Sequence, residues 1–296
     1  MIEGRIVKAL SGFYYVQCDQ EIVACRARGR FRLDGLSPLV GDRVTLDRQE
    51  DGTGTVTGVL PRRNAFGRPA VANVDLLVMV VSEAIPETDP YLADRVTVRC
   101  EKNRVGAALV INKCDLSSGE RLASIYAGTG YPVWIVSAAT GEGIDALREG
   151  LAGKICCFTG NSGVGKSSVL NALDASLSIP TGEVSEKLGR GRHTTRHVEL
   201  YDIGDGIYIA DTPGFASFGD ELEEPIRPEE LSALFPDFSG FRSGCRFMDC
   251  THRREPGCRV REAVGDGSVH PSRYASYLRL YEEASAVPRW EIGKKT

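Results

Sequence analysis

A phosphate-binding loop is predicted at Gly160-Asn161-Ser162-Gly163-Val164-Gly165-Lys166-Ser167, which has the spacing G-x-x-x-x-G-K-[ST]. Its glycines let backbone N–H groups surround phosphate oxygens without a side-chain clash, and the N-terminus of the following helix adds a favourable dipole. Lys166 would bridge the β- and γ-phosphates, and Ser167, beside Ser168, would give its hydroxyl oxygen to Mg²⁺. The loop predicts a nucleoside triphosphatase but does not select the base.

Three further motifs predict that the base is guanine. In Asn112-Lys113-Cys114-Asp115, the Asp carboxylate can accept two hydrogen bonds from guanine N1–H and N2–H₂, a donor pair that adenine does not offer. Asn112 can brace the loop, and the stem of Lys113 can lie over the base. Ser137-Ala138 can place a backbone N–H on guanine O6. Asp211-Thr212-Pro213-Gly214 supplies an Asp for the Mg²⁺ shell and a Gly N–H that senses the γ-phosphate.

The order of these motifs is unusual. In an ordinary small GTPase the phosphate loop comes first and the guanine motifs come last, whereas here 112–115 and 137–138 precede 160–167, and 211–214 follow. We therefore expect a circularly permuted domain, in which the segment after 214 leads directly into a third domain. Transmission of movement from this nucleotide-sensing loop to a partner of the third domain is a hypothesis. Equal partner affinities with GTP and GDP analogues would count against it.

The segment 187–196 occupies the place of the first switch; it is rich in Gly and Arg and contains no acid. Either Thr194 or Thr195 should bind Mg²⁺ when the γ-phosphate is present, and Thr195 is favoured. Phe215 stands where small GTPases of the familiar kind carry a Gln that orients the attacking water. His193 is the candidate for this catalytic role, and the alternative is that His193 contacts a partner.

Four residues predict a closed, structural zinc site: Cys245, Cys250, His252 and Cys258. Four protein ligands leave no open position for a catalytic water. The alternative is three free thiols, which is disfavoured because free cysteines prefer apolar burial and this segment is mostly polar. The metal would also stabilise a segment that has too few apolar residues to fold alone.

The elements that must position these residues form three predicted regions. Residues 1–63 contain short strands separated by glycines and predict an OB-fold β-barrel. Residues 64–218 alternate apolar strands with helices, as in a doubly wound α/β domain. Residues 219–296 predict a mainly helical zinc-binding domain. The strands are expected at 75–82, 107–111, 133–136, 154–158 and 207–210, and the helices at 92–103, 120–126, 144–151, 167–173, 228–234 and 272–284.

The net charge of −4, from 36 Lys+Arg and 40 Asp+Glu, argues against a simple polyanion binder. Locally the charge is segregated, and an acid-free run places arginines at 26, 28, 30 and 32. On a strand these four would share one face, which suits phosphate contact, although a solvated strand face is the alternative. With no secretory signal and no apolar run of membrane-spanning length, we expect a cytoplasmic protein without membrane association. We also expect a monomer.

The chain resembles the bacterial ribosome small subunit-dependent GTPase A (RsgA) family over essentially its whole length. The resemblance rests on the permuted motif order, the Cys-x₄-Cys-x-His-x₅-Cys spacing, Gly191-Arg192-His193-Thr194-Thr195 and Asp211-Thr212-Pro213-Gly214-Phe215. It implies an OB-fold, a permuted GTPase domain and a zinc-binding domain. It also implies binding to ribosomal RNA and a late role in small-subunit maturation, with GTP hydrolysis to GDP and phosphate stimulated by the subunit. The family's catalytic histidine would correspond to His193.

Two other functions compete with a GTPase that acts in ribosome assembly. One is an RNA-binding module in which the nucleotide is mainly structural; Lys166, Ser167 and Asp211 argue instead for retained Mg²⁺-GTP chemistry. The other is a metabolic P-loop kinase, which is disfavoured because residues 112–115 specify guanine and no acceptor pocket is evident. A turnover assay with and without small subunits separates the first two.

Overall fold

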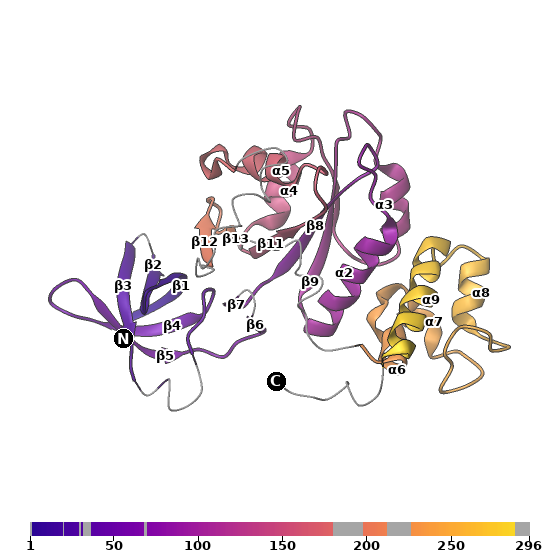
Figure 1. Cartoon of the computed structure of the whole chain (residues 1–296), viewed down its shortest axis with the longest axis horizontal. Coiled ribbons are helices and arrows are strands. Elements are labelled where there is room, and N and C mark those ends of the chain that lie inside the picture. Colours follow the sequence, from indigo (N-terminus) through magenta and orange to yellow (C-terminus); the bar gives the residue numbers. More distant parts are fainter. Residues whose placement is uncertain are drawn as a thin grey trace.

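The computed structural model describes residues 2–19, 21–29, 31, 37–67, 70–179, 198–211 and 226–287. Figure 1 shows a barrel at one end of the molecule, a sheet with helices on both sides in the middle, and a group of helices at the other end. The predicted multidomain α/β fold is therefore confirmed. Within the described residues, no helix is both long enough and apolar enough to cross a membrane.

The N-terminal barrel is closed by five strands, as the glycine-punctuated pattern predicted. The hairpin β1–β2 continues to β3, β3 pairs with β5, β5 with β4, and β4 returns to β1. Alternate residues such as Ile6, Val16 and Leu46 fill the interior and are completely buried. The strands are β1 (Ile2–Leu10), β2 (Phe13–Cys18), β3 (Glu21–Ala27), β4 (Arg43–Arg48) and β5 (Gly54–Val59).

The predicted arginine face of the barrel is only partly correct. Strand β3 ends at Ala27, so Arg26 is the one member of the run on this strand. Arg28 lies beyond the strand, where it pairs with Asp47 at 3.3 Å. The chain turns at this point, which a pattern of alternating arginines cannot reveal. Residues 30 and 32 lie outside the described residues.

The central sheet is parallel and has helices on both faces. Residues Val78 and Val80 of β8 pack with helices α4 and α5, whereas Met79 and Val81 pack with α2 and α3. Strand order is β10-β9-β8-β11-β13. The strands are β8 (Leu76–Ser82), β9 (Gly106–Asn112), β10 (Val133–Ile135), β11 (Ile155–Thr159) and β13 (Tyr208–Asp211), and the helices are α2 (Pro90–Asn103), α3 (Glu120–Tyr126), α4 (Ile144–Leu151) and α5 (Lys166–Leu173).

The barrel and the central sheet are joined into one eleven-stranded sheet, which the sequence did not predict. Strand β12 (Glu199–Asp202) pairs antiparallel with β13 on one side and with β1 of the barrel on the other. A short hairpin of β6 (Ala65–Gly67) and β7 (Ala70–Ala72) lies in the connection between the two parts of the chain. The barrel is therefore continuous with the central sheet and is not joined to it by a linker alone.

The C-terminal region packs its helices around an aromatic core that includes Phe235, Phe238 and Tyr277, all buried. The long helix α9 (Pro271–Ala286) lies against α2 of the central domain. The predicted helix at 228–234 divides into α6 (Pro228–Leu231) and a 3-10 turn at Ser232–Leu234. The remaining elements are a 3-10 turn at Pro236–Phe238, α7 (Ser239–Arg242) and α8 (Arg259–Gly265).

Candidate functional site

The predicted nucleotide motifs lie at the carboxyl ends of four parallel strands. Residue 112 ends β9, 137 follows β10, 160 follows β11, and 211 ends β13. The carboxyl ends of parallel strands meet at one edge of a sheet, which is where open α/β folds bind ligands. The permuted order of the motifs along the chain is thus compatible with a single site in space.

The phosphate loop connects β11 to helix α5, and two of its glycines are required by their surroundings. Gly160 has φ 149° and Gly165 has φ 92°, conformations that residues with a side chain rarely adopt. A Cβ at Gly160 would collide with the carbonyl oxygen of Val80, and one at Gly165 would collide with the amide of Asn112. Helix α5 begins at Lys166, so its free N–H groups face the position expected for phosphate.

Asn112 links the guanine motifs to the phosphate loop. Its Nδ2 donates to the carbonyl oxygen of Val164 at 2.9 Å, and its Oδ1 accepts from the backbone N–H of Ala138 at 3.0 Å. Asn112 is only 4% exposed, so these bonds are sheltered from water. One buried side chain therefore connects three of the four predicted motifs, as the bracing role predicted for Asn112 requires.

The carboxylate predicted to read guanine is oriented by the neighbouring motif. Ser137 Oγ donates to Asp115 Oδ1 at 2.6 Å, and Ser137 is completely buried. Lys113 has φ 70°, and its Nζ donates to the carbonyl oxygen of Ile85 at 2.7 Å. Cys114 is tied to the sheet because its N–H donates to the carbonyl oxygen of Val136 at 3.0 Å. The loop thus has a defined shape in the described structure.

Several predicted site residues lie outside the described residues. They are His193, Thr194, Thr195, Thr212, Pro213, Gly214 and Phe215. Asp211 is placed at the end of β13, opposite Glu199 of β12. The predicted catalytic and switch residues therefore remain predictions. Mg²⁺ fits the residue types predicted to bind it, because Ser and Asp, the residues at 167 and 211, carry hydroxyl and carboxylate oxygens, the ligands that Mg²⁺ prefers.

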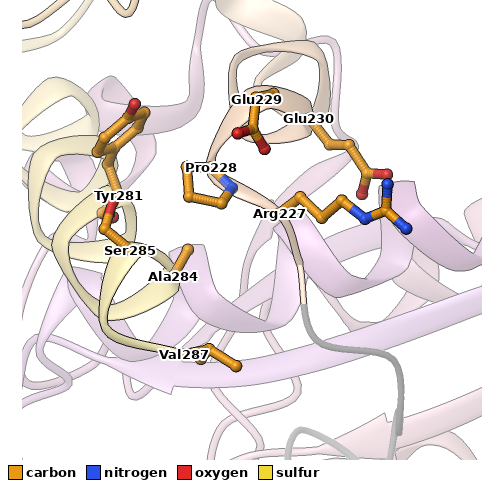
Figure 2. A pocket seen from close by; sticks show the side chains of 8 residues that line it. All are labelled: Arg227, Pro228, Glu229, Glu230, Tyr281, Ala284, Ser285 and Val287. Atoms are coloured by element: carbon orange, nitrogen blue, oxygen red, sulfur yellow. The ribbon is translucent and has the colours of Figure 1, made fainter. Parts of the chain in front are cut away.

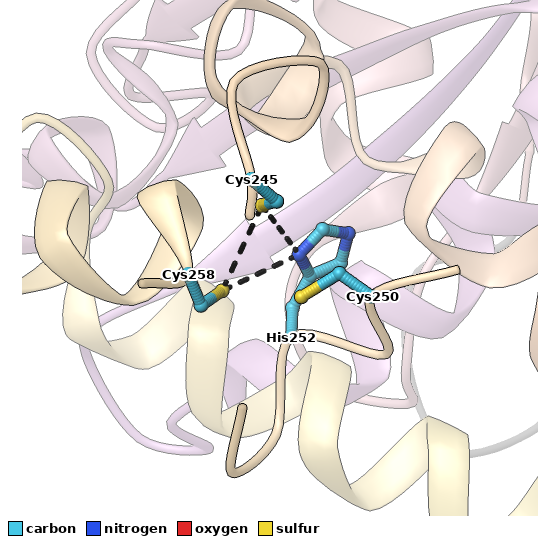
Figure 3. A group of neighbouring side chains, drawn as sticks. All are labelled: Cys245, Cys250, His252 and Cys258. Carbon is cyan, nitrogen blue, oxygen red and sulfur yellow. Dashed lines mark hydrogen bonds between the residues drawn. The ribbon is translucent and has the colours of Figure 1, made fainter. Parts of the chain in front are cut away.

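The four predicted metal ligands come together in space. One ligand atom from each residue lies within 4.8 Å of the others. His252 Nδ1 lies 3.5 Å from the sulfur atoms of both Cys245 and Cys258, which are 4.0 Å apart. Figure 3 shows Cys250 beside these three residues. Burial raises the pKa of the Cys250 thiol to about 12 and lowers the pKa of His252. A bound cation would reverse the effect on the thiol, because it favours the thiolate. The cluster could therefore hold a metal ion.

Three residues that support this cluster were not identified from the sequence. Glu255 accepts hydrogen bonds from the backbone N–H groups of Thr251, Arg253 and Arg254 at 2.9–3.0 Å, and so shapes the loop between two ligands. Tyr274 Oη donates to the carbonyl oxygen of His252, and Tyr277 Oη to that of Thr251, both at 2.7 Å. An acidic residue inside a loop of metal ligands was the available signal for Glu255.

A separate cavity of about 670 Å³ lies between α6 and the end of α9. Figure 2 shows Pro228 and Glu229 facing Tyr281 and Ser285 across it. None of the described residues that line this cavity belongs to the predicted nucleotide or metal sets. The cavity therefore has no part in the site defined by the motifs.

The fold and the site define a circularly permuted P-loop GTPase. The RsgA GTPase family profile matches residues 59–221, more than half of the chain, and the RsgA N-terminal domain profile matches residues 3–56. The chain belongs to the RsgA GTPase family, as the sequence resemblance indicated.

Full-length relatives and solved structures agree with this assignment. The small ribosomal subunit biogenesis GTPase RsgA of Caldanaerobacter subterraneus is 44% identical over 285 residues, which cover 95% of each chain. That of Moorella thermoacetica is 44% identical and covers 97% of this chain and 99% of the relative. The crystal structure of YjeQ from Thermotoga maritima matches with a TM-score of 0.83 and 39% identity, covering 97% of this chain and 99% of that one. YloQ, a circularly permuted GTPase, matches with a TM-score of 0.80 and 36% identity over 98% and 97% of the two chains.

Proposed function

We propose that this chain binds GTP with Mg²⁺, hydrolyses it to GDP and phosphate, and acts in biogenesis of the small ribosomal subunit, whose binding stimulates the hydrolysis. The observation that carries the nucleotide part is the position of Asn112, which contacts both the phosphate loop and Ala138. The names of the full-length relatives support the ribosomal part.

In this proposal each motif holds one part of the nucleotide. Backbone N–H groups of residues 160–168 surround the phosphates, and Lys166 neutralises charge on the β- and γ-phosphates as a water attacks the γ-phosphorus. Asp115 accepts from guanine N1–H and N2–H₂, and the N–H of Ala138 donates to O6. Ser167 and Asp211 contribute to holding Mg²⁺, together with Thr195, and His193 orients the water.

The same proposal assigns a structural Zn²⁺ to Cys245, Cys250, His252 and Cys258. Three thiolates and one imidazole are ligands that Zn²⁺ favours, and a set of four leaves no open position. We assign ribosomal RNA as a partner of the flanking domains. The guanidinium of Arg26 lies 4.6 Å from the ring centre of Phe13 on the barrel surface, a pairing of charge and aromatic face that suits nucleic acid.

The experiment that tests the function measures GTP turnover with small subunits, with large subunits and with neither. We expect stimulation by small subunits only, and its loss in Lys166→Ala. Tight RNA binding with no turnover under any condition would favour the alternative of an RNA-binding module with a structural nucleotide. In His193→Ala, unchanged stimulated turnover would remove this histidine from the mechanism.

A further inference from the structure

We propose that Glu83 is a positioning residue that holds the guanine-reading loop in shape and thereby sets the preference for guanine. The proposal rests on the function proposed above. Glu83 directly follows strand β8 and belongs to none of the nucleotide motifs. Its Oε2 accepts a hydrogen bond from Ser117 Oγ at 3.0 Å, and its Oε1 accepts from the backbone N–H of Leu122 at 2.6 Å. One carboxylate thus joins β8, the loop 113–117 and helix α3.

The bond to Leu122 replaces the side-chain cap that the N-cap residue of helix α3 cannot supply. The N-cap residue of α3 is Gly119, which has no side chain to accept a hydrogen bond. Gly119 has φ 75°, and a Cβ there would come within 3.0 Å of Ile111 and 3.1 Å of Ile135. A capping side chain at the N-cap position is therefore excluded. Ser118 Oγ accepts only from the N–H of Glu120, at 3.4 Å, and the carboxylate of Glu83 supplies the acceptor for Leu122 and a favourable negative charge.

The turn that contains Glu83 also holds the other end of the guanine-reading loop. Lys113 Nζ donates to the carbonyl oxygen of Ile85, two residues after Glu83. The two ends of the turn are joined because Thr88 N–H donates to the carbonyl oxygen of Ser82 at 2.8 Å, and Ser82 N–H donates to Thr88 Oγ1 at 3.0 Å. The first and last residues of the loop 113–117 are therefore both attached to this turn.

Asp115 lies in the middle of this fastened loop. The loop is closed on itself because the N–H groups of Leu116 and Ser117 donate to the carbonyl oxygen of Lys113 at 2.9 and 3.2 Å. A carboxylate that accepts two hydrogen bonds from one base edge needs its position defined to about 0.5 Å. If the Ser117 side chain is released, Asp115 keeps the bond from Ser137 and the loop keeps its internal backbone bonds, but its last residue is no longer attached to the turn that contains Glu83. The contacts to guanine should then weaken more than the contacts to the phosphates.

The experiment compares the dissociation constants of GDP and of inosine diphosphate, which lacks the exocyclic amino group that Asp115 would bind. We expect Glu83→Ala to lower the preference for GDP over inosine diphosphate by roughly three- to tenfold. Ser117→Ala should lower it in the same direction, because it removes the bond to the loop but leaves the cap on α3. Glu87→Ala is the matched control: this exposed residue of the same turn pairs with Arg121 and does not contact the loop, so the preference should not change.

Other outcomes would contradict either the positioning role of Glu83 or the guanine site itself. An unchanged preference in both Glu83→Ala and Ser117→Ala, with only a lower melting temperature for Glu83→Ala, would leave Glu83 as a helix cap and refute the positioning role. If the preference for GDP changes in Glu83→Ala but not in Ser117→Ala, the positioning role is also refuted. The effect would then come from loss of the cap on α3 and not from release of the loop. If Glu83→Ala does not fold, Ser117→Ala decides. Wild-type protein that binds GDP no more tightly than ADP would refute the guanine site itself.

Discussion

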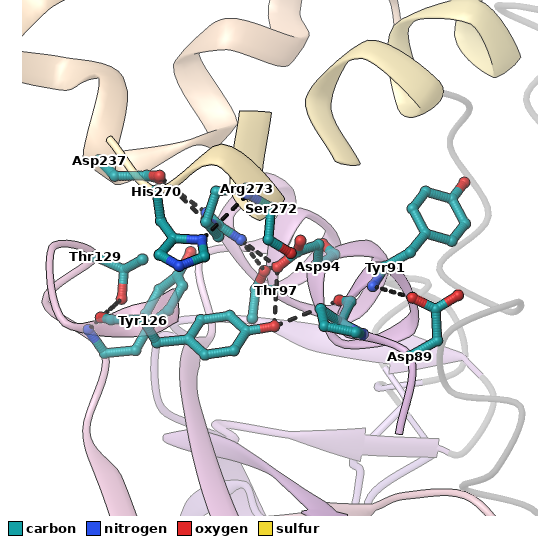
Figure 4. Close-up of polar contacts among 12 residues, drawn as sticks. Asp89, Tyr91, Asp94, Thr97, Tyr126, Thr129, Asp237, His270, Ser272 and Arg273 are labelled. Atoms are coloured by element: carbon teal, nitrogen blue, oxygen red, sulfur yellow. Dashed lines mark hydrogen bonds and ion pairs between the residues drawn. The ribbon is translucent and has the colours of Figure 1, made fainter. Parts of the chain in front are cut away.

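The two domains that flank the GTPase domain each form a junction with it, and the ion pairs at these two junctions differ in burial. At the barrel, Lys8 pairs with Glu199 at 2.9 Å, and about a third of each side chain is exposed. At the C-terminal domain, Arg273 of α9 pairs with Asp94 of α2 at 2.6 Å and with Asp237 at 2.9 Å, and all three are buried. Figure 4 shows Arg273 between these two carboxylates, and Tyr126 Oη donates to the same Asp94 oxygen that accepts from Arg273.

This difference in burial indicates which ion pair can be removed without a large loss of stability. Both junctions bury apolar residues: the barrel core continues into the central sheet, and Val98 of α2 belongs to the C-terminal core. At the barrel, the sheet ladder and this core do not depend on the charged pair. At the C-terminal domain, removal of the arginine would leave two buried carboxylates without their cation, which is far more costly than loss of a surface pair.

The two junctions also differ in what they contact. The barrel pairs with β12, and β12 pairs with β13, which ends at the predicted magnesium ligand Asp211. The C-terminal domain contacts α2, which contains none of the predicted site residues. Coupling of the C-terminal domain to the nucleotide through the segment after 214 stays a hypothesis, since that segment lies outside the described residues.

The largest effect is expected for Arg273→Ala, which should lower the free energy of unfolding by about 3–5 kcal/mol. Urea denaturation of the full chain measures this. Arg279→Ala is the matched control on the same helix, because Arg279 stacks on Tyr91 of α2 but its side chain is 59% exposed. We expect a loss of about 1 kcal/mol or less for this control. Equal losses in the two variants would remove the distinction between the junctions.

A smaller effect is expected for Glu255→Gln, which tests whether the metal loop is needed for the C-terminal junction. Burial alone would raise the pKa of Glu255, but hydrogen bonds from Thr251 and the backbone lower it to about 2. The carboxylate therefore stays ionised at neutral pH. Its contribution to stability is lost only as the pH falls from the ordinary glutamate pKa of about 4.3 toward about 2.

Competition with a chelator should show metal affinity reduced by about tenfold in Glu255→Gln, and equally so at about pH 6 and about pH 8. Glu262→Gln, at an exposed pair with Arg259, should bind metal like the wild type. If Glu255→Gln also lowers the free energy of unfolding as much as Arg273→Ala does, the junction at the C-terminal domain depends on the metal loop.

The smallest effect is expected for Lys8→Ala at the barrel, about 0.2–1 kcal/mol in the free energy of unfolding and less in high salt. The hydrogen bond to Glu199 raises the pKa of Lys8, so the contribution of the pair is present at neutral pH and is lost as the pH rises through this raised value. Urea denaturation at low and high salt measures it. A loss above about 2 kcal/mol would mean that the ion pair at the barrel junction matters as much as the buried pairs of Arg273, and the contrast between the two junctions would be wrong.

Local features were predicted well from the sequence. The helices expected at 120–126 and 144–151 have these bounds in the structure, and the strand expected at 75–82 begins one residue later, at Leu76, and ends at Ser82 as expected. The reason is that apolar periodicity and turn residues act over a few positions. The arginine run shows the limit: its alternation continues beyond the end of β3, because side-chain spacing does not reveal where pairing with a neighbouring strand stops.

The sequence by itself determined the chemistry proposed for the site, because the phosphate-loop motif, the guanine motif with Asp115 and the Cys/His set are recognised by residue type and short spacing. Only the tertiary structure decided which residues support that chemistry. Glu83 and Ser117 are 34 positions apart, and Asp94 and Arg273 are 179 apart. An acidic or basic residue type does not identify its partner, since pairing depends on which surfaces the fold buries together.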